Sequence, residues 1–141
     1  MLTPDERRTI VTETLKFKSD KMLYYYGCTD PDTASTINYV RHAATEGAGG
    51  AIVAAPPCII ASREDIVQYC LDVADASYIP LGFYNNPPRV GTDLTTPDLL
   101  RLVEHPRFVI QKESTTRVGH VAQICAAKPY MALMCCCAPN T

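Results

Sequence analysis

The chain has 141 residues, of which 47% are hydrophobic and 20% charged, so we expect a globular body rather than a disordered chain. Its 13 Lys and Arg residues face 15 Asp and Glu residues, which leaves a formal net charge of −2. This balance argues against a nucleic-acid partner, which needs concentrated positive charge. The sequence contains neither an apolar run of membrane-spanning length nor the pattern of a signal peptide. We therefore expect a cytoplasmic protein with no membrane partner.

The first elements of the chain are marked by clear start and stop signals. Thr3 and Glu6 have the spacing of a capping box, which predicts a helix over residues 4–17. An aromatic run predicts a strand over residues 22–26. The helix after it is expected to open at Asp30-Pro31 and to end at Gly47. The order strand then helix sets the pattern for the rest of the chain.

The same unit of strand and helix then repeats along the sequence. Apolar runs predict five strands, over residues 22–26, 51–55, 80–84, 108–112 and 130–135. Capping or helical patterns predict the later helices, which start at Ser62, at Thr96 and near Arg117. Apolar strands that alternate with amphipathic helices indicate parallel βαβ units, because a parallel sheet is covered by its crossover helices.

Two α/β architectures fit this repeat, an open doubly wound sheet or part of a (β/α)8 TIM barrel. No Gly-x-Gly-x-x-Gly turn follows any predicted strand, which disfavours the dinucleotide-binding sheet and favours the barrel. Five of eight strands cannot close a barrel. Residues 1–141 are therefore expected to form one partial barrel domain that lacks the first N-terminal and the last C-terminal units.

The seven cysteines are odd in number and irregular in spacing, unlike a disulfide framework or paired metal hooks. Four stand among apolar neighbours, where a reduced thiol behaves as a small hydrophobe: Cys28, Cys58, Cys70 and Cys125. The run 135–137 cannot place three thiolates on one metal, because adjacent strand residues point to opposite faces. We expect no metal, and a thiol-dependent redox or metal protein is the minor alternative that thiol titration would test.

Two chemically capable side chains end neighbouring predicted strands. Lys112 is either a strand-end lysine that reaches water or a partly desolvated amine that attacks a carbonyl carbon. Tyr84 is either an aromatic at the edge of the core or a group that moves protons. Neighbouring parallel strands lie about 4.8 Å apart, so the two side chains can share a pocket. Together they predict Schiff-base chemistry with a proton relay.

Four segments of the chain resemble one family. Residues 81–94, LGFYNNPPRVGTDL, resemble the Tyr-Asn-x-Pro-x-Arg-x-Gly segment of the dihydrodipicolinate synthase/N-acetylneuraminate lyase family. Residues 110–115 look like its lysine motif, and residues 2–7 and 41–50 fit in order and spacing. The resemblance implies a (β/α)8 barrel that acts on pyruvate or another small-molecule 2-keto acid. It also implies a homo-oligomer that uses no metal or organic cofactor.

The resemblance also assigns roles to residues. Lys112 would be the Schiff-base lysine, and Tyr84 the tyrosine that relays protons and contacts the keto-acid carboxylate. Arg89 would bind a carboxylate near the entrance of the site, although without the family it reads as a solvated turn residue. Cys58 stands where the synthase branch has a second relay tyrosine, and the family's Gly-Thr-Thr-Gly-Glu carboxylate-binding segment does not occur in the chain.

Two functions follow from this sequence. The first is a Schiff-base-forming lyase, aldolase, synthase or dehydratase that acts on pyruvate or a related 2-keto acid. The alternative is a catalytically silent barrel fragment, or degenerate family member, that acts only as an assembly partner. In that alternative a second chain would cover the open sheet edges, because an unpaired edge invites pairing.

Overall fold

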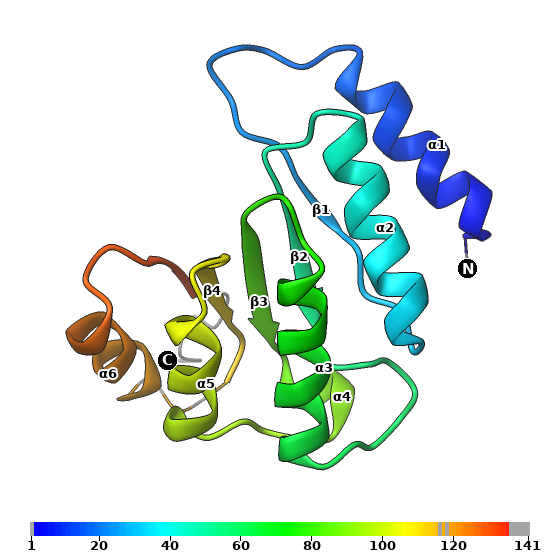
Figure 1. Cartoon of the computed structure of the whole chain (residues 1–141). Coiled ribbons are helices and arrows are strands. Elements are labelled where there is room, and N and C mark those ends of the chain that lie inside the picture. The colour runs from blue at the N-terminus through cyan, green and yellow to red at the C-terminus, as the bar shows by residue number, and fades with distance from the viewer. Residues whose placement is uncertain (1, 116, 118, 136–141) are drawn as a thin grey trace, which may run out of the picture.

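The computed structural model describes residues 2–115, 117 and 119–135, which form one parallel sheet with helices packed against it (Figure 1). The five strands are β1 (Tyr25–Gly27), β2 (Gly50–Ala54), β3 (Leu81–Asn85), β4 (Phe108–Glu113) and β5 (Ala132–Cys135). Their order in the sheet is β1-β2-β3-β4-β5. A doubly wound sheet would reverse its order in the middle, so this is the sequential arrangement of a barrel segment, as predicted.

The six helices lie between these strands and before the first one. They are α1 (Pro4–Leu15), α2 (Thr33–Thr45), α3 (Arg63–Asp75), α4 (Pro87–Val90), α5 (Thr96–Glu104) and α6 (Gly119–Ala127). Helix α3 packs between α2 and α5, and α5 also contacts α6 (Figure 1). Right-handed crossovers in a steady strand order place such helices on one face of the sheet. Among the described residues, no helix has the length and apolar character needed to cross a membrane.

Side-chain caps explain why several helices begin where the sequence predicts. The Thr3 Oγ1 atom accepts a hydrogen bond from the Glu6 backbone N–H at 3.3 Å, and the Glu6 carboxylate accepts one from the Thr3 N–H at 2.8 Å. The Ser62 Oγ atom accepts from the Asp65 N–H at 3.1 Å at the start of α3. Each bond satisfies a donor that the first turn of a helix leaves unpaired.

Several boundaries differ from the prediction; strand β5, for example, starts at Ala132 rather than at residue 130. Helix α1 ends at Leu15 rather than at residue 17, because the Phe17 N–H bonds to the Thr14 carbonyl in a tighter turn. Strand β1 starts at Tyr25 rather than at residue 22, because Tyr25 is the first residue with a partner in β2. The sequence predicted no helix at α4, although its prolines fit a first turn, where no backbone N–H is needed.

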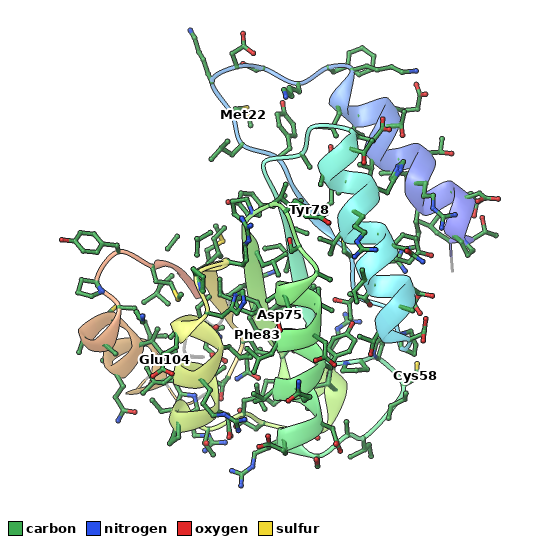
Figure 2. All side chains as sticks on the ribbon, in the orientation of Figure 1. Met22, Cys58, Asp75, Tyr78, Phe83 and Glu104 are labelled. Atoms are coloured by element: carbon green, nitrogen blue, oxygen red, sulfur yellow. The ribbon has the colours of Figure 1, made fainter. Side chains whose placement is uncertain are left out.

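The two faces of the sheet differ in burial. We use "helix-covered face" for the side on which Ala51, Val53, Leu81 and Phe83 are at most 1% exposed, with Phe83 near the centre of the molecule (Figure 2). We use "open face" for the opposite side, which carries the strand residues Ile52, Ala54, Tyr84, Lys112 and Met134. These five are partly or largely exposed. The alternation follows from the period of two along a strand.

Candidate active site

The candidate site lies on the open face, at the carboxyl-terminal edge of the sheet. The ladder pairs Ala54 with Tyr84, Tyr84 with Lys112, and Lys112 with Met134, so these residues form one row across four strands. The Lys112 Nζ atom lies 4.0 Å from the centre of the Tyr84 ring. An ammonium over an aromatic face is attracted by the negative charge of that face. The structure therefore brings together the two residues that the sequence singled out.

This pairing depends on an irregular step in the ladder between β3 and β4. Leu81 pairs with Phe108, but the next residue of β3, Gly82, pairs with Ile110, so that Val109 is an extra residue in β4. Such a bulge changes which side chains share a face. Without it, Tyr84 would pair with Gln111 instead of Lys112.

The hydroxyl of Tyr84 has a second neighbour in the loop that follows β4. The Tyr84 Oη atom lies 3.1 Å from the Ser114 Oγ atom. The Ser114 backbone N–H donates to the carbonyl of Asn85 at 2.9 Å, which extends the pairing one step beyond the strand. Sequence reasoning quoted Ser114 only as part of the lysine motif. Its position two residues after Lys112, hence on the same face, was a signal that could have identified it.

A polar network occupies the opposite side of these strand ends. Glu113 is 1% exposed, and its two carboxylate oxygens accept hydrogen bonds from the Asn85 side-chain amide at 2.8 Å and the Gln111 amide at 3.2 Å. Burial raises the pKa of Glu113 above its ordinary value, while the two amide donors act in the opposite direction. Asn85 also donates to Asp93 at 3.3 Å, and Arg117 pairs with Asp93. The network ties the ends of β3 and β4 to the loops that follow them.

Arg89 reaches the same edge from α4. A cavity of about 360 Å³ opens beside Tyr84 and is lined by the loops after β1, β2 and β3, including Thr29, Cys58 and Arg89. Arg89 is exposed, and its charge is available at the mouth of this cavity. Figure 2 shows Cys58 on the loop between β2 and α3. A guanidinium, a phenol and a thiol thus face one opening, and Lys112 lies against the phenol.

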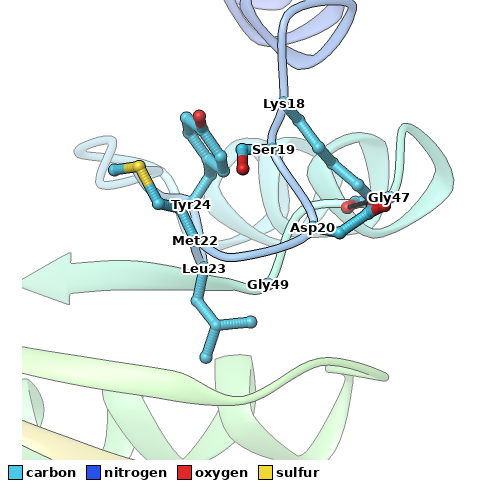
Figure 3. A pocket seen from close by; sticks show the side chains of 8 residues that line it. All are labelled: Lys18, Ser19, Asp20, Met22, Leu23, Tyr24, Gly47 and Gly49. Atoms are coloured by element: carbon cyan, nitrogen blue, oxygen red, sulfur yellow. Dashed lines mark hydrogen bonds between the residues drawn. The ribbon is translucent and has the colours of Figure 1, made fainter.

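A second cavity, of about 260 Å³, lies at the opposite edge of the sheet, before β1 and β2 (Figure 3). Its lysine, Lys18, donates to the carbonyl of Gly47 at 3.2 Å. In parallel α/β folds the reactive side chains gather at the carboxyl ends of the strands. This cavity lies at their amino ends, so we do not assign the chemistry to it.

The cysteines fall into two groups. Cys28 and Cys70 are buried, as the sequence predicted, and burial raises the pKa of Cys28 to about 12. Cys58 and Cys125 are exposed, which does not fit the expectation that their thiols behave as small hydrophobes, whereas all four cysteines are free thiols as expected. Of the run 135–137, residues 136 and 137 and the side chain of residue 135 lie outside the described part of the chain. Within that part, no group of three or more His, Cys, Asp or Glu residues could hold a metal ion.

Comparison with known proteins agrees with the resemblance seen in the motifs. Residues 1–136 match the model of the Dihydrodipicolinate synthetase family. The chain belongs to this family. The 4-hydroxy-tetrahydrodipicolinate synthase of Gluconacetobacter diazotrophicus is 30% identical over 135 residues, which cover 94% of this chain and 46% of the relative. The corresponding synthase of Streptococcus mutans is 34% identical over 131 residues, 91% of this chain and 44% of the relative.

Solved structures of the family have the same fold. The chloride-inhibited dihydrodipicolinate synthase of Acinetobacter baumannii, in complex with pyruvate, is 27% identical, with a TM-score of 0.88 over 96% of this chain and 47% of that one. The dihydrodipicolinate synthase of Aquifex aeolicus has a TM-score of 0.89 at 21% identity, which shows the fold alone. The chain spans less than half the length of these relatives, and its sheet is part of a TIM barrel.

Proposed function

We propose that the protein is a lyase of this family and that Lys112 forms a Schiff base with the keto carbon of pyruvate or a related 2-keto acid. The observation that carries the proposal is the contact between the Lys112 amine and the Tyr84 ring, 4.0 Å from its centre, at the carboxyl-terminal edge of the sheet. The same observation supports an enzyme over the catalytically silent assembly partner. A partner that served only as a scaffold would not need an amine and a phenol in contact at this edge.

The proposed chemistry uses both groups. The Lys112 nitrogen bonds to the keto carbon, and the keto oxygen takes up protons and leaves as water. The protonated imine withdraws electrons from the adjacent carbon, which then loses a proton or forms or breaks a carbon–carbon bond. Tyr84 accepts a proton from the carbinolamine and returns it. The imine is its own electron sink, so the proposal includes no metal or organic cofactor.

Arg89 completes the proposed site as the group that binds a substrate carboxylate. Its exposed guanidinium lines the cavity beside Tyr84, and a guanidinium binds a carboxylate with two parallel hydrogen bonds. The pyruvate bound in the Acinetobacter baumannii relative supports a 2-keto acid as the substrate class.

The open face supports a proposal about the assembly. We propose that residues 1–141 form part of a larger barrel domain, and that the other strand-helix units of this barrel cover the open face. Met134 there is 50% exposed, and such apolar surface is normally covered by further structure. We also propose that the protein works in the cytoplasm as a homo-oligomer. Sedimentation of the protein as a stable monomer at micromolar concentration would contradict the oligomer.

Trapping with borohydride tests the proposed function. Incubation with pyruvate and borohydride should attach one reduced pyruvyl group to Lys112, located by peptide mass spectrometry. Lys112→Met should abolish the adduct. The matched control is Lys18→Met, which removes the lysine of the opposite cavity and should leave the adduct unchanged. The absence of an adduct, or equal labelling of Lys112 and Lys18, would overturn the proposal.

A further inference from the structure

The hydroxyl groups of Tyr84 and Ser114 lie 3.1 Å apart at the end of the row that contains Lys112. Among the described residues, Ser114 provides the hydrogen-bond partner of the Tyr84 hydroxyl. Ser114 follows β4 and is partly exposed to solvent. The three residues are therefore neighbours in series: the Lys112 amine lies against the Tyr84 ring, and the Tyr84 hydroxyl lies beside the Ser114 hydroxyl.

The backbone holds Ser114 in this place. Its N–H donates to the Asn85 carbonyl at 2.9 Å, and Asn85 directly follows Tyr84 in β3. On the helix-covered side of the same strand ends, the Asn85 amide donates to Glu113, which directly precedes Ser114, at 2.8 Å. Each of the two hydroxyl-bearing residues is therefore adjacent in sequence to one member of a buried hydrogen-bonded pair. That pair holds together the two strand ends that carry the Tyr84 and Ser114 side chains.

When the Tyr84 phenol accepts a proton in the proposed reaction, it has to give up its own hydroxyl proton to a neighbour. Otherwise it loses the hydrogen bond that this hydroxyl makes. A neighbouring hydroxyl allows both movements at once, because it can accept one proton while it donates another. Tyr84 can take a proton from the carbinolamine as its own proton moves to the Ser114 oxygen. The Ser114 proton then passes to water, and the reverse sequence restores the starting state. The sequence leaves no net charge on either hydroxyl.

We propose that Ser114 is a positioning residue for the reaction at Lys112, which orients the Tyr84 hydroxyl and carries its proton to solvent. The inference rests on the proposed function, since it concerns the formation of the same imine. Ser114 does not touch the reacting carbon in this scheme. It acts through Tyr84, and its effect should disappear when the Tyr84 hydroxyl is absent.

The test measures the rate of imine formation on the whole chain, by borohydride trapping after timed exposure to pyruvate. Ser114→Ala should slow the rate by about three- to tenfold, the value of one hydrogen bond between neutral groups. Ser114→Thr keeps a hydroxyl and should restore most of the rate. The matched control is Ser62→Ala, which removes a hydroxyl that caps α3 and should leave the rate unchanged.

A second measurement separates the relay from a merely structural role. In a Tyr84→Phe background, Ser114→Ala should cause no additional slowing, whereas a structural role would slow both backgrounds equally. Equal slowing would overturn the inference about Ser114, and so would an unchanged rate in Ser114→Ala. The inference would also be contradicted if Ser114→Thr had the same melting temperature as the parent chain but did not restore the rate of imine formation. No adduct in the parent chain would instead overturn the proposed function itself.

Discussion

The two faces of the sheet are made from alternate residues of the same strands, yet they differ in nearly every physical respect. In β2, Ala51 and Val53 are fully buried under the helices, while Ile52 and Ala54, which alternate with them, remain partly exposed. All four side chains are apolar, so residue type does not explain the difference. The side of the strand decides burial, and a helix covers only one side in the described structure.

The same division separates stability from chemistry at the strand ends. On the helix-covered side, Asn85 and Gln111 both donate hydrogen bonds to Glu113, and all three residues are nearly completely buried. On the open side, Lys112 and Tyr84 contact each other within reach of solvent. We infer that the buried network holds the geometry and that the open face carries the reaction.

The largest effect is expected from truncation on the helix-covered face. Phe83→Ala should lower the free energy of unfolding by about 3–5 kcal/mol, because it removes a buried aromatic side chain and leaves a cavity. Ile52→Ala on the open face should cost about 1 kcal/mol, since that side chain is already partly exposed. Urea denaturation followed by circular dichroism measures both values. Equal losses would show that the two faces are equally packed in solution.

A smaller but still large effect is expected at the buried carboxylate. Glu113→Ala should lower the free energy of unfolding by about 2–3 kcal/mol, because it removes the buried carboxylate that accepts hydrogen bonds from the side-chain amides of Asn85 and Gln111. Glu104→Ala is the matched control, at an exposed glutamate at the end of α5, and should change it by less than about 0.5 kcal/mol (Figure 2). If Glu113→Ala left the free energy of unfolding unchanged, the hydrogen-bond network around Glu113 would not contribute to stability.

The pH dependence of stability should carry the signature of the same residue. Because the pKa of Glu113 is raised in the folded state, the folded state holds this proton more firmly than the unfolded state. Stability should therefore fall as the pH rises from 4.5, the ordinary value, through the raised pKa. Chemical denaturation at a series of pH values should show this fall in the parent and not in Glu113→Gln.

Asp32 provides a comparison of opposite sign at an exposed position. The backbone N–H of Ser35 holds the pKa of Asp32 below its ordinary value, because the N-cap hydrogen bond favours the charged carboxylate. The contribution of Asp32 to the stability of the folded state is present above pH 3.8 and is lost as the pH falls through the lowered pKa. Asp32→Asn should remove this acid-side loss in the same denaturation series. If the parent and Asp32→Asn lost the same stability at acid pH, the pKa of Asp32 would not contribute to this loss.

The smallest effect is expected at a helix cap. Ser62→Ala should lower the free energy of unfolding by about 1 kcal/mol, because it removes the acceptor of the Asp65 N–H at the start of α3. It loosens the helix-covered face without touching the open face. Thermal denaturation should therefore shift while the rate of adduct formation stays constant. If Ser62→Ala lowered both the melting temperature and the rate of adduct formation, the two faces would be coupled through α3.

Much of the fold could be predicted because its signals are local. The capping patterns at Thr3 and Ser62 and the apolar runs of the strands are written in consecutive residues, and the strand order follows from handedness. Helix α4 was missed because Pro87 and Pro88 signal a break as readily as a first turn. The start of β1 was misplaced because it depends on where β2 begins.

The site was predictable only in part. Lys112 and Tyr84 were found from their strand-end positions and a motif, and Arg89 from the motif alone; their roles stay predictions. The contact between Tyr84 and Ser114 and the bond between Asn85 and Glu113 join residues about one βα unit apart. Such contacts depend on the register of two strands, which the sequence does not state.

The extra residue in β4 gives this register a further meaning. Leu81 and Phe108 are paired, and Tyr84 lies an odd number of residues after Leu81, whereas Lys112 lies an even number after Phe108. With regular pairing, the two side chains would therefore point to opposite faces of the sheet. Val109 changes the parity of everything that follows it. Omitting Val109 should leave Lys112 beside Tyr84, whereas inserting a residue after Ile110 should place Gln111 beside Tyr84 instead of Lys112. A one-residue insertion at this point would therefore change which side chains of β4 lie on the open face, even though no residue of the candidate site has been substituted.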